Sequence, residues 1–410
     1  MEALLIVQKY GGTSVGTAER IHAVADRVAR TVKDGSTVAI VVSAMGHTTD
    51  ELVSLAEAMT KKPSLRELDA LLSTGEQVSA ALLAMALMER GIPAQSFSGR
   101  QAGIQTEPVF GSARVASIDT EALHEALCEG IVPVITGFQG YAGDDVTTLG
   151  RGGSDTTAVA IAAVLKADRC DIFTDVNGVY TTDPRLVSKA RKLQMVSYDE
   201  MLELANLGAQ VLHPRAVENA KRHQVPLVVR SSFTEEEGTY VTEISNLEQT
   251  SVVTGIAFER EVARVAVIGV SLQKHGLATV FGTLAREGVN VDVIVQSVVQ
   301  TVDADVSFTV REGDADATLQ LMRRMQEELG YRHLVLETEL AKVSIVGAGM
   351  ISNPGVAARM FEVLAEVGIE IKMVSTSEIK VSCIIAATDM EEAVKSLHQA
   401  FLESDGTVGA

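Results

Sequence analysis

Two glycine-rich turns carry basic side chains and indicate what chemistry this chain could perform. The first, residues 9–14 (KYGGTS), follows an apolar strand expected at residues 4–7 and is predicted to open a helix. The second, residues 150–155 (GRGGSD), precedes a helix-like run over residues 158–165. Such turns present free N–H groups and the positive end of a helix dipole, and glycine lets an anion approach closely. With Lys9 and Arg151 beside the glycines, the turns predict two anion sites, the first for a nucleotide phosphate.

The spacing of the first turn differs from that of a Walker A loop, which needs GxxxxGK followed by Ser or Thr. Either turn alone could be a tight turn that uses glycine only for its positive φ. The formal net charge of −19 argues against general nucleic-acid binding, which needs a basic surface. An anionic ligand must therefore be held by a local basic cluster, and this gives Lys9 and Arg151 additional weight.

The cysteines, the N-terminus and the lack of a long apolar run predict a cytoplasmic protein without a membrane partner, and the acidic charge predicts no nucleic-acid partner. A chain of 410 residues is long enough for two or three domains with large cores. Cys128, Cys170 and Cys383 lie far apart without metal-ligand spacing, so we expect reduced thiols and no resident metal site. The N-terminus has no basic leader region, and no apolar run was expected to reach the ~18 residues of a membrane span.

The first 250 residues have the pattern of an α/β domain. Strands that are apolar on both faces suit a parallel sheet covered by helices; they are expected at residues 38–42, 132–136, 172–174 and 227–229. A helix between the first two strands is predicted by apolar residues at helical spacing, with Thr17 as N-cap and Gly35 beyond its end. Further helices are expected at residues 77–90 and 215–223.

The rest of the chain contains an internal repeat. An acidic, polar stretch over residues 235–250 marks a boundary. Beyond it, residues 263–269 resemble residues 341–347, and residues 281–291 resemble residues 361–371. Each copy has the order strand, helix, strand, strand, helix, and two copies are too few for a solenoid. We therefore predict a pair of small βαββαβ modules.

Eight sequence segments together resemble the aspartokinases along essentially the whole chain, and the overall pattern is most similar to the lysine-responsive aspartokinases of bacilli. They are KYGGTS (9–14), VVSAMGHTTDEL (41–52), STGEQVSAALLAMAL (73–87), GFQG (137–140), TTLGRGGSDTTA (147–158), FTDVNGVYTTDPR (173–185), YDEMLELANLGAQVLHPRAVENA (198–220) and VSTSEIKVS (374–382). The resemblance implies an α/β fold: an amino-acid-kinase (carbamate-kinase-like) αβα sandwich with a mostly parallel sheet, followed by two ACT domains. The implied boundaries are residues 1–245 for the kinase, 246–262 for a linker and first strand, and 263–336 and 337–410 for the ACT domains.

The implied reaction transfers the γ-phosphoryl of ATP to the side-chain carboxylate of L-aspartate, giving 4-phospho-L-aspartate, the first step toward lysine, methionine and threonine. A carboxylate nucleophile has a pKa near ~4 and is already ionised at neutral pH, so no general base is needed. The site must bring two anions into line and stabilise the transferring group with cations. Mg²⁺ is expected to arrive with ATP, held mainly by phosphate oxygens and water.

The resemblance also implies roles for individual residues. The catalytic ones are Lys9, which stabilises the transferring phosphoryl, Arg151, which holds the α-carboxylate, and Asp155, which orients the lysine. ATP contacts are expected at Lys9, Tyr10, Gly11, Gly12, Ser43, Thr174, Asp175, Tyr180, Asp183, Arg185 and Gln210. Aspartate contacts are expected at Ser43, Thr48, Glu76, Arg151, Gly152, Gly153 and Ser154, with Glu76 binding the amine.

Several of these residues have simpler structural interpretations. Glu76 could be a carboxylate favoured by a helix N-terminus, Asp155 could be a helix cap, and Asp183 with Pro184 could form a plain turn. Gln210 stands where many relatives carry lysine, so a cation that contacts phosphate is absent at that position. We expect Gln210→Lys to tighten apparent ATP binding at low salt; an unchanged or weaker ATP dependence would contradict this.

ACT domains bind small amino acids, so the resemblance implies feedback inhibition by lysine, alone or together with threonine. Expected effector contacts are Asn290, Val291, Asp292 and Gln296 in the first module and Ser375, Thr376 and Glu378 in the second. These polar residues could instead only end strands. The loop over residues 271–276 lacks the DxPG pattern of threonine-responsive relatives, which favours lysine acting alone. Exposed sheet edges predict a homo-oligomer through the ACT domains, and a shorter ACT-only chain is a further expectation.

Two classes of alternative remain open at this stage. Another small-molecule kinase, acting on acetylglutamate, glutamate, carbamate or UMP, would have the same fold. A catalytically silent amino-acid sensor would also keep the fold while losing turnover. The KYGGTS segment with the ACT pair favours aspartate, and Lys9, Glu76, Arg151 and Asp155 favour an enzyme.

Overall fold

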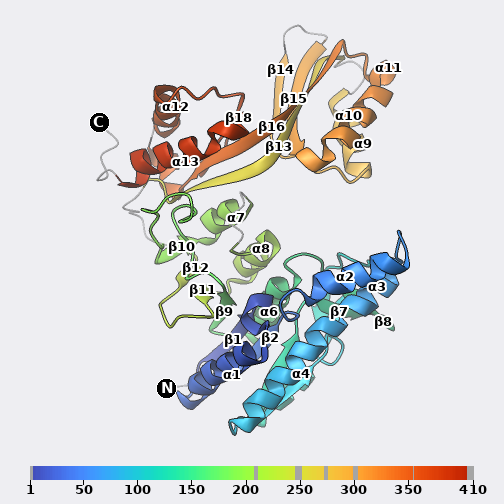
Figure 1. Ribbon diagram of the computed structural model, residues 1–410, viewed down its shortest axis with the longest axis vertical. Coiled ribbons are helices and arrows are strands. Elements are labelled where there is room, and N and C mark those ends of the chain that lie inside the picture. The colour runs from blue at the N-terminus through green and yellow to red at the C-terminus, as the bar shows by residue number, and fades with distance from the viewer. Residues whose placement is uncertain are drawn as a thin grey trace. The chain divides into compact units, whose positions relative to one another are not determined.

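The computed structural model describes residues 3–206, 211–244, 252–271, 276–298, 303–353 and 355–403, which form two compact units (Figure 1). Within those residues, the first unit holds 3–179, 192–206 and 211–244, and the second holds 180–191 and 252–403. The prediction of an α/β kinase-like domain followed by paired modules is confirmed at this level. Each unit has its own sheet and core, so each is described by itself.

The first unit is built on an eight-stranded sheet in the order β10-β12-β11-β9-β1-β2-β6-β3. Its strands are β1 (Leu5–Tyr10), β2 (Thr37–Val42), β3 (Ala94–Phe97), β6 (Val132–Thr136), β9 (Arg169–Thr174), β10 (Met195–Ser197), β11 (Leu227–Ser231) and β12 (Thr239–Thr242). All neighbours pair in parallel except β11 and β12. The four predicted strands and the first strand are all present, and several are longer than expected.

Helices cover both faces of this sheet. The helices of the first unit are α1 (Ala18–Lys33), α2 (Thr48–Met59), α3 (Leu65–Leu72), α4 (Thr74–Glu89), α5 (Glu121–Cys128), α6 (Gly153–Leu165), α7 (Tyr198–Asn206) and α8 (Pro214–His223). Alternate residues Val38, Ile40 and Val42 of β2 pack against α1 and α4. The intervening Ala39 and Val41 are fully buried as well, and α6 lies against β1, β2 and β9. This double burial is why β2 is apolar on both faces over residues 38–42.

The first helix begins and ends where the sequence predicted. The Thr17 Oγ1 caps the start of α1 by accepting a hydrogen bond from Arg20 N at 3.3 Å, and Gly35 follows the end of the helix with φ +93°.

A small second sheet, in the order β5-β4-β7-β8, was not predicted from the sequence. Its strands are β4 (Ile104–Thr106), β5 (Val115–Ile118), β7 (Gln139–Ala142) and β8 (Asp145–Thr148). These strands are too short for periodicity to reveal them.

One helical stretch is long and apolar enough to meet the criteria for a membrane span, which corrects the expectation that no apolar run reaches that length. It is Leu65–Glu89, which covers α3 and α4. Fully buried Leu83 and Leu87 lie in the core of the first unit, and 56% of the apolar window is buried. The stretch therefore has the burial of a core helix.

The second unit has one six-stranded antiparallel sheet in the order β14-β15-β13-β16-β18-β17. Its elements are β13 (Gly255–Ser271), α9 (Gly276–Arg286), β14 (Ile294–Val298), β15 (Asp303–Arg311), α10 (Ala315–Arg324), α11 (Gln326–Leu329), β16 (His333–Val346), α12 (Val356–Glu366), β17 (Met373–Thr376), β18 (Lys380–Ala386) and α13 (Met390–His398). The repeat predicted from the sequence is therefore present, with both copies contributing to a single sheet.

The boundary expected between residues 262 and 263 falls inside the continuous strand β13. Residues 255–259 of β13 pair with residues 342–346 of β16, whereas residues 262–268 pair with residues 333–340 of β16 on one side and, like residues 270–271, with β15 on the other. The second module is therefore completed by a strand that precedes the first module in the sequence. Periodicity cannot show this, because a single strand has the same alternation whichever partners it has.

A segment of the expected kinase range, residues 180–191, packs within the second unit. The Thr181 carbonyl accepts a hydrogen bond from Ile256 N at 2.7 Å, and Thr181 Oγ1 lies 3.0 Å from His398 Nε2. Val187 is buried in the core formed with α12 and α13. Sequence order alone had assigned this segment to the catalytic domain.

Candidate active site

Lys9 and Asp155 form a close ion pair at the end of β1. Lys9 Nζ lies 2.6 Å from Asp155 Oδ1, and both side chains are nearly buried. Lys9 is carried by β1, while Asp155 stands in the first turn of α6. Asp155 could have been a helix cap, but the N-cap position is Gly152, so the carboxylate is free to hold the lysine. The pair places a charged ammonium where a phosphate could reach it.

The first glycine turn approaches a neighbouring loop closely. A Cβ at Gly12 would lie 2.9 Å from the Ala44 carbonyl oxygen, so a larger residue would force the two segments apart. Gly46 N donates to the Gly12 carbonyl at 3.0 Å, which ties the turn to the same loop. The turn continues as a 3₁₀ helix, Gly12–Val15, whereas α1 begins only at Ala18. KYGGTS therefore leads into α1 through one short 3₁₀ helix, and α1 begins directly after Thr17, its predicted N-cap.

The second glycine turn forms the N-terminus of α6, as predicted. Gly150 and Gly152 both have positive φ, +75° and +71°, which glycine adopts without the strain that a side chain would bring. At Gly152 a Cβ would also lie 2.1 Å from His213 Cγ. The turn therefore needs glycine for its backbone and for the close approach of His213.

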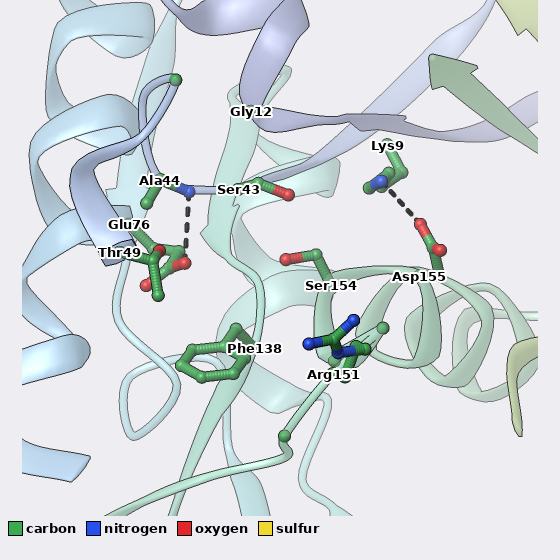
Figure 2. Close-up of a pocket in the computed structure, with 14 residues that line it drawn as sticks. Lys9, Gly12, Ser43, Ala44, Thr49, Glu76, Phe138, Arg151, Ser154 and Asp155 are labelled. Atoms are coloured by element: carbon green, nitrogen blue, oxygen red, sulfur yellow. Dashed lines mark hydrogen bonds and ion pairs between the residues drawn. The ribbon is translucent and has the colours of Figure 1, made fainter. Parts of the chain in front are cut away.

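A pocket of about 300 Å³ lies between the two turns. It is lined by Lys9, Gly12, Ser43, Ala44, Gly46, Thr49, Glu76, Phe138, Gly150, Arg151, Gly152, Gly153, Ser154 and Asp155. Figure 2 shows the Ser43 and Ser154 hydroxyls pointing into the same space. The structure thus brings together Lys9, Arg151 and Asp155, predicted as catalytic, with most of the residues predicted to contact aspartate.

Glu76 is a buried carboxylate in this pocket. It lies in the first turn of α4, is 3% exposed, and accepts a hydrogen bond from Ala44 N at 3.1 Å through Oε1 (Figure 2). Its Oε2 has no hydrogen-bond partner among the described residues. Burial raises the pKa of Glu76 to about 7, against the opposing effect of hydrogen bonds that include the one from Ala44. A helix N-terminus alone does not explain a buried carboxylate with one oxygen left unpartnered, and that oxygen is suited to receive a cationic group.

Two predicted contacts are placed differently by the structure. Tyr10 is fully buried, stacks on Phe173 with ring centroids 4.7 Å apart, and donates from its hydroxyl to Gln8 Oε1 at 3.1 Å. Its side chain therefore stabilises the core and does not line the pocket. Thr49 lines the pocket in place of Thr48, which is the first residue of α2.

Phe138 is a pocket residue that the sequence analysis did not assign. It is one of the few described residues other than glycine with positive φ, +68°. Its N–H donates to Thr157 Oγ1 at 3.2 Å, and its carbonyl accepts from Leu149 N at 2.8 Å. A backbone held in a sparsely populated region is common at functional sites. The glycines of GFQG were the only sequence signal for this position.

The residues predicted to cradle adenosine do not line this pocket. Thr174 and Asp175 follow β9 in the first unit, with Thr174 Oγ1 bonded to Asp175 Oδ1 at 3.1 Å. Tyr180 and the turn at residues 183–185 belong to the second unit. There Arg185 lies 2.7 Å from Asp183 Oδ2, and this hydrogen-bonded pair lowers the pKa of Asp183. A turn would contain this pair with or without a bound nucleotide, so the nucleotide contacts at Asp183 and Arg185 stay predictions. Gln210 lies outside the described residues.

The predicted effector residues lie at the two edges of the second unit's sheet. Gln296 is on β14, and Ser375 and Thr376 are on β17, with Glu378 just beyond. Asn290, Val291 and Asp292 precede β14. The Asp292 carboxylate is bonded by Lys342, whose Nζ also lies 2.6 Å from Glu259 Oε2.

Lys342 is 5% exposed and its ion pairs keep it charged. Burial works to lower its pKa, but Glu259 and Asp292 outweigh that effect and raise it. The Lys342 ammonium therefore already bonds the Asp292 carboxylate, which was predicted to bind the amine of an effector.

Comparison with known proteins agrees with this architecture. The amino acid kinase family matches residues 5–231, and ACT domains match residues 266–330 and 343–401. The aspartokinase of Bacillus sp. (strain MGA3) is 57% identical over 98% of each chain. The structure of E. coli aspartokinase III in complex with aspartate and ADP (R-state) has a TM-score of 0.83 at 30% identity and covers 97% of this chain and 99% of that one. The same enzyme in complex with lysine and aspartate (T-state) has a TM-score of 0.75 at 30% identity, with the same coverage.

The fold and the pocket define a small-molecule kinase of the amino acid kinase type joined to ACT domains. The chain belongs to the aspartokinase family. The resemblance found in the sequence is confirmed.

Proposed function

We propose that this enzyme transfers the γ-phosphoryl group of ATP to the β-carboxylate of L-aspartate, giving 4-phospho-L-aspartate, the first step toward lysine, methionine and threonine. The observation that carries the proposal is the Lys9–Asp155 pair at 2.6 Å in the same pocket as Glu76 and Arg151. A cation for a transferring phosphoryl therefore lies beside a carboxylate and a guanidinium that match the amine and α-carboxylate of an amino acid.

The reaction requires the protein mainly to position the two reactants and to supply positive charge. The attacking carboxylate of aspartate is already ionised at neutral pH, so no residue has to remove a proton. Lys9 stabilises negative charge on the transferring group, and Asp155 fixes the position of Lys9. Arg151 holds the α-carboxylate through its planar guanidinium, and Glu76 receives the α-ammonium.

ATP is proposed to bind with its phosphates at the first glycine turn, contacted by Gly11, Gly12 and Ser43. The predicted contacts for the rest of the nucleotide are Thr174, Asp175, Tyr180, Asp183, Arg185 and Gln210. The oxygen donors beside Lys9, the Asp155 carboxylate and the Ser43 and Ser154 hydroxyls, suit Mg²⁺ held mainly by phosphate oxygens and water. Bound in this way, Mg²⁺ would neutralise phosphate charge during transfer.

Inhibition by lysine is proposed through the ACT modules. E. coli aspartokinase III, which matches 97% of this chain, has been crystallised with lysine and aspartate. Carboxylate and amide groups at Asn290, Asp292, Gln296 and Glu378 suit an ammonium ligand. Lysine acting alone is favoured over lysine with threonine, because the DxPG pattern of threonine-responsive relatives is absent from residues 271–276. A cytoplasmic homo-oligomer and a shorter ACT-only chain stay predictions.

Hydroxamate trapping of acyl phosphate tests the proposal directly. The enzyme is incubated with ATP, magnesium and L-aspartate, with and without lysine, threonine or both. Aspartate-dependent product that lysine suppresses supports both halves of the proposal, and synergy with threonine would overturn lysine acting alone. Folded protein that yields acyl hydroxamate only with acetylglutamate or glutamate, or that releases ADP only with carbamate or UMP, belongs to a different acceptor class, and one that turns over none of them is a sensor.

A further inference from the structure

The backbone on both sides of Arg151 is held by side chains from a distant helix. Leu149 O accepts a hydrogen bond from Arg215 Nη1 at 2.7 Å. The Gly152 backbone lies against the ring of His213, the N-cap of α8. The Arg151 guanidinium itself has no hydrogen bond or ion pair among the described residues. Its position therefore depends on the backbone that carries it.

A buried carboxylate holds the same stretch from α3. Asp69 is 0% exposed. Its Oδ2 accepts from Thr148 N at 2.8 Å and from Gly111 N at 2.9 Å, and its Oδ1 accepts from Thr148 Oγ1 at 2.7 Å. Every donor to this side chain is a backbone N–H or a hydroxyl, so the carboxylate is saturated with hydrogen bonds instead of neutralised by a cation.

Arg215 and Asp69 join the same two segments of the chain. Arg215 Nη2 also donates to Ala113 O at 3.2 Å, while Asp69 accepts from Gly111 N. Ala113 N donates to Thr148 O at 2.8 Å between these two points. Residues 111–113 and residues 148–149 are thus fastened together by one side chain from α3 and one from α8, immediately before Arg151.

We propose that Asp69 and Arg215 are positioning residues for the aspartate α-carboxylate: they fix the backbone before Arg151 and so set where its guanidinium lies in the pocket. The inference rests on the proposed function, because it takes Arg151 as the carboxylate-binding group. A guanidinium that binds a carboxylate through two hydrogen bonds needs a defined position, and small displacements of a binding group are costly to affinity and rate.

The chemical nature of the two side chains supports positioning over simple packing. Burying a charged group is unfavourable, and well-packed apolar residues of similar volume often stabilise a fold as well or better. What a carboxylate and a guanidinium add is directional bonding to several specific backbone groups at once. Asp69 and Arg215 use that property on the two segments that precede Arg151.

The test measures separate KM values for aspartate and ATP in Arg215→Ala, Arg215→Lys and Asp69→Asn, with Arg222→Ala as the matched control. Arg222 is on the same helix, is mostly exposed, and only approaches Glu218 at 4.0 Å. We expect Arg215→Ala and Asp69→Asn to raise the KM for aspartate by about 10-fold or more, with the KM for ATP within about 2-fold of wild type. Arg215→Lys should recover only part of the loss. Its ammonium can bond one carbonyl, but it cannot reach both carbonyls in the geometry of a guanidinium.

Hydrogen exchange over residues 149–153 gives a readout that needs no turnover. Faster exchange there in Arg215→Ala, with the rest of the first unit unchanged, supports the proposal. Two results would overturn it: an unchanged KM for aspartate despite a lowered melting temperature, or equal increases in the KM for aspartate and for ATP. If Asp69→Asn fails to fold, Arg215→Ala decides the question. Failure of the proposed function would be evident separately, since wild-type enzyme would then yield no aspartyl hydroxamate.

Discussion

Asp155 Oδ1 lies 2.6 Å from Lys9 Nζ, joining the end of the central strand β1 to the first turn of α6. The two residues come from different glycine turns, so the pair also links the predicted phosphate site to the predicted aspartate site. A nearly buried lysine held by one carboxylate has a fixed position, and that position lies where a transferring phosphoryl group needs a cation.

Lys9→Ala should lower kcat by about 10²-fold to 10³-fold, the usual cost of removing one group that stabilises transition-state charge. Lys9→Arg should recover little activity, because the larger guanidinium does not fit a nearly buried position beside Asp155. Steady-state hydroxamate assays measure both variants, with the exposed Lys61→Ala as control. A Lys9→Ala enzyme that keeps more than about a tenth of wild-type kcat would contradict the role given to Lys9.

The raised pKa of Glu76, about 7, predicts pH-dependent use of aspartate. As the pH falls through 7 the free enzyme protonates Glu76, so the group that receives the aspartate ammonium loses its charge and kcat/KM for aspartate falls. In Glu76→Gln the KM for aspartate should rise by about 10-fold to 100-fold, the cost of a lost hydrogen bond to a charged group. Its kcat/KM should also lose the wild-type dependence between pH 6 and 8. An unaltered pH profile in Glu76→Gln would assign the titration to another group.

The same pKa predicts how stability changes with pH. Because burial raises the pKa of Glu76 above its ordinary value of 4.5, the folded state binds this proton more tightly than the unfolded state does. The contribution of Glu76 to the free energy of unfolding therefore falls as the pH rises from about 4.5 to 7. Urea unfolding at pH 5 and pH 8 should show Glu76→Gln gaining stability relative to wild type at the higher pH. A difference that does not vary with pH would show that the carboxyl titrates normally.

Gly152→Ala should be more disruptive than Gly35→Ala, although both glycines have positive φ. A Cβ at Gly35 has nothing within 4 Å, so only the backbone strain of about 1–2 kcal/mol is expected there. A Cβ at Gly152 would add a clash with His213 Cγ at 2.1 Å and displace the turn that carries Arg151. Urea midpoints and the KM for aspartate compare the two variants. Equal losses in both would mean that the contact with His213 is unimportant.

Lys342→Met should increase sensitivity to lysine without changing kcat in its absence. The substitution removes the internal ammonium that bonds Asp292, so an effector ammonium no longer competes with it. Inhibition curves for lysine should shift to lower concentration in Lys342→Met and to higher concentration in Asp292→Asn. If lysine inhibition weakens in both variants, Lys342 supports the effector site and does not compete with the effector.

The local sequence predicted the catalytic framework well, because its signals act over a few residues. The apolar strands of the parallel sheet, the Thr17 cap, the glycines at 150 and 152 and the internal repeat all follow from short-range periodicity and backbone preference. Lys9, Glu76, Arg151 and Asp155 were identified from their motifs, and they line one pocket. The side chain of Tyr10 was assigned to a nucleotide because the motif contains it, but its aromatic ring is part of the core.

Tertiary structure alone decided the features that join distant parts of the chain. Asp69 and Arg215 hold residues 148–149, Lys342 bonds Asp292, β13 completes the second module, and residues 180–191 pack in the second unit. These relationships depend on which surfaces are buried together and on which backbone donors need partners inside the fold. The periodicity of a single segment carries no record of its partner, so the sequence determined the elements and their chemistry while packing determined which residues act together.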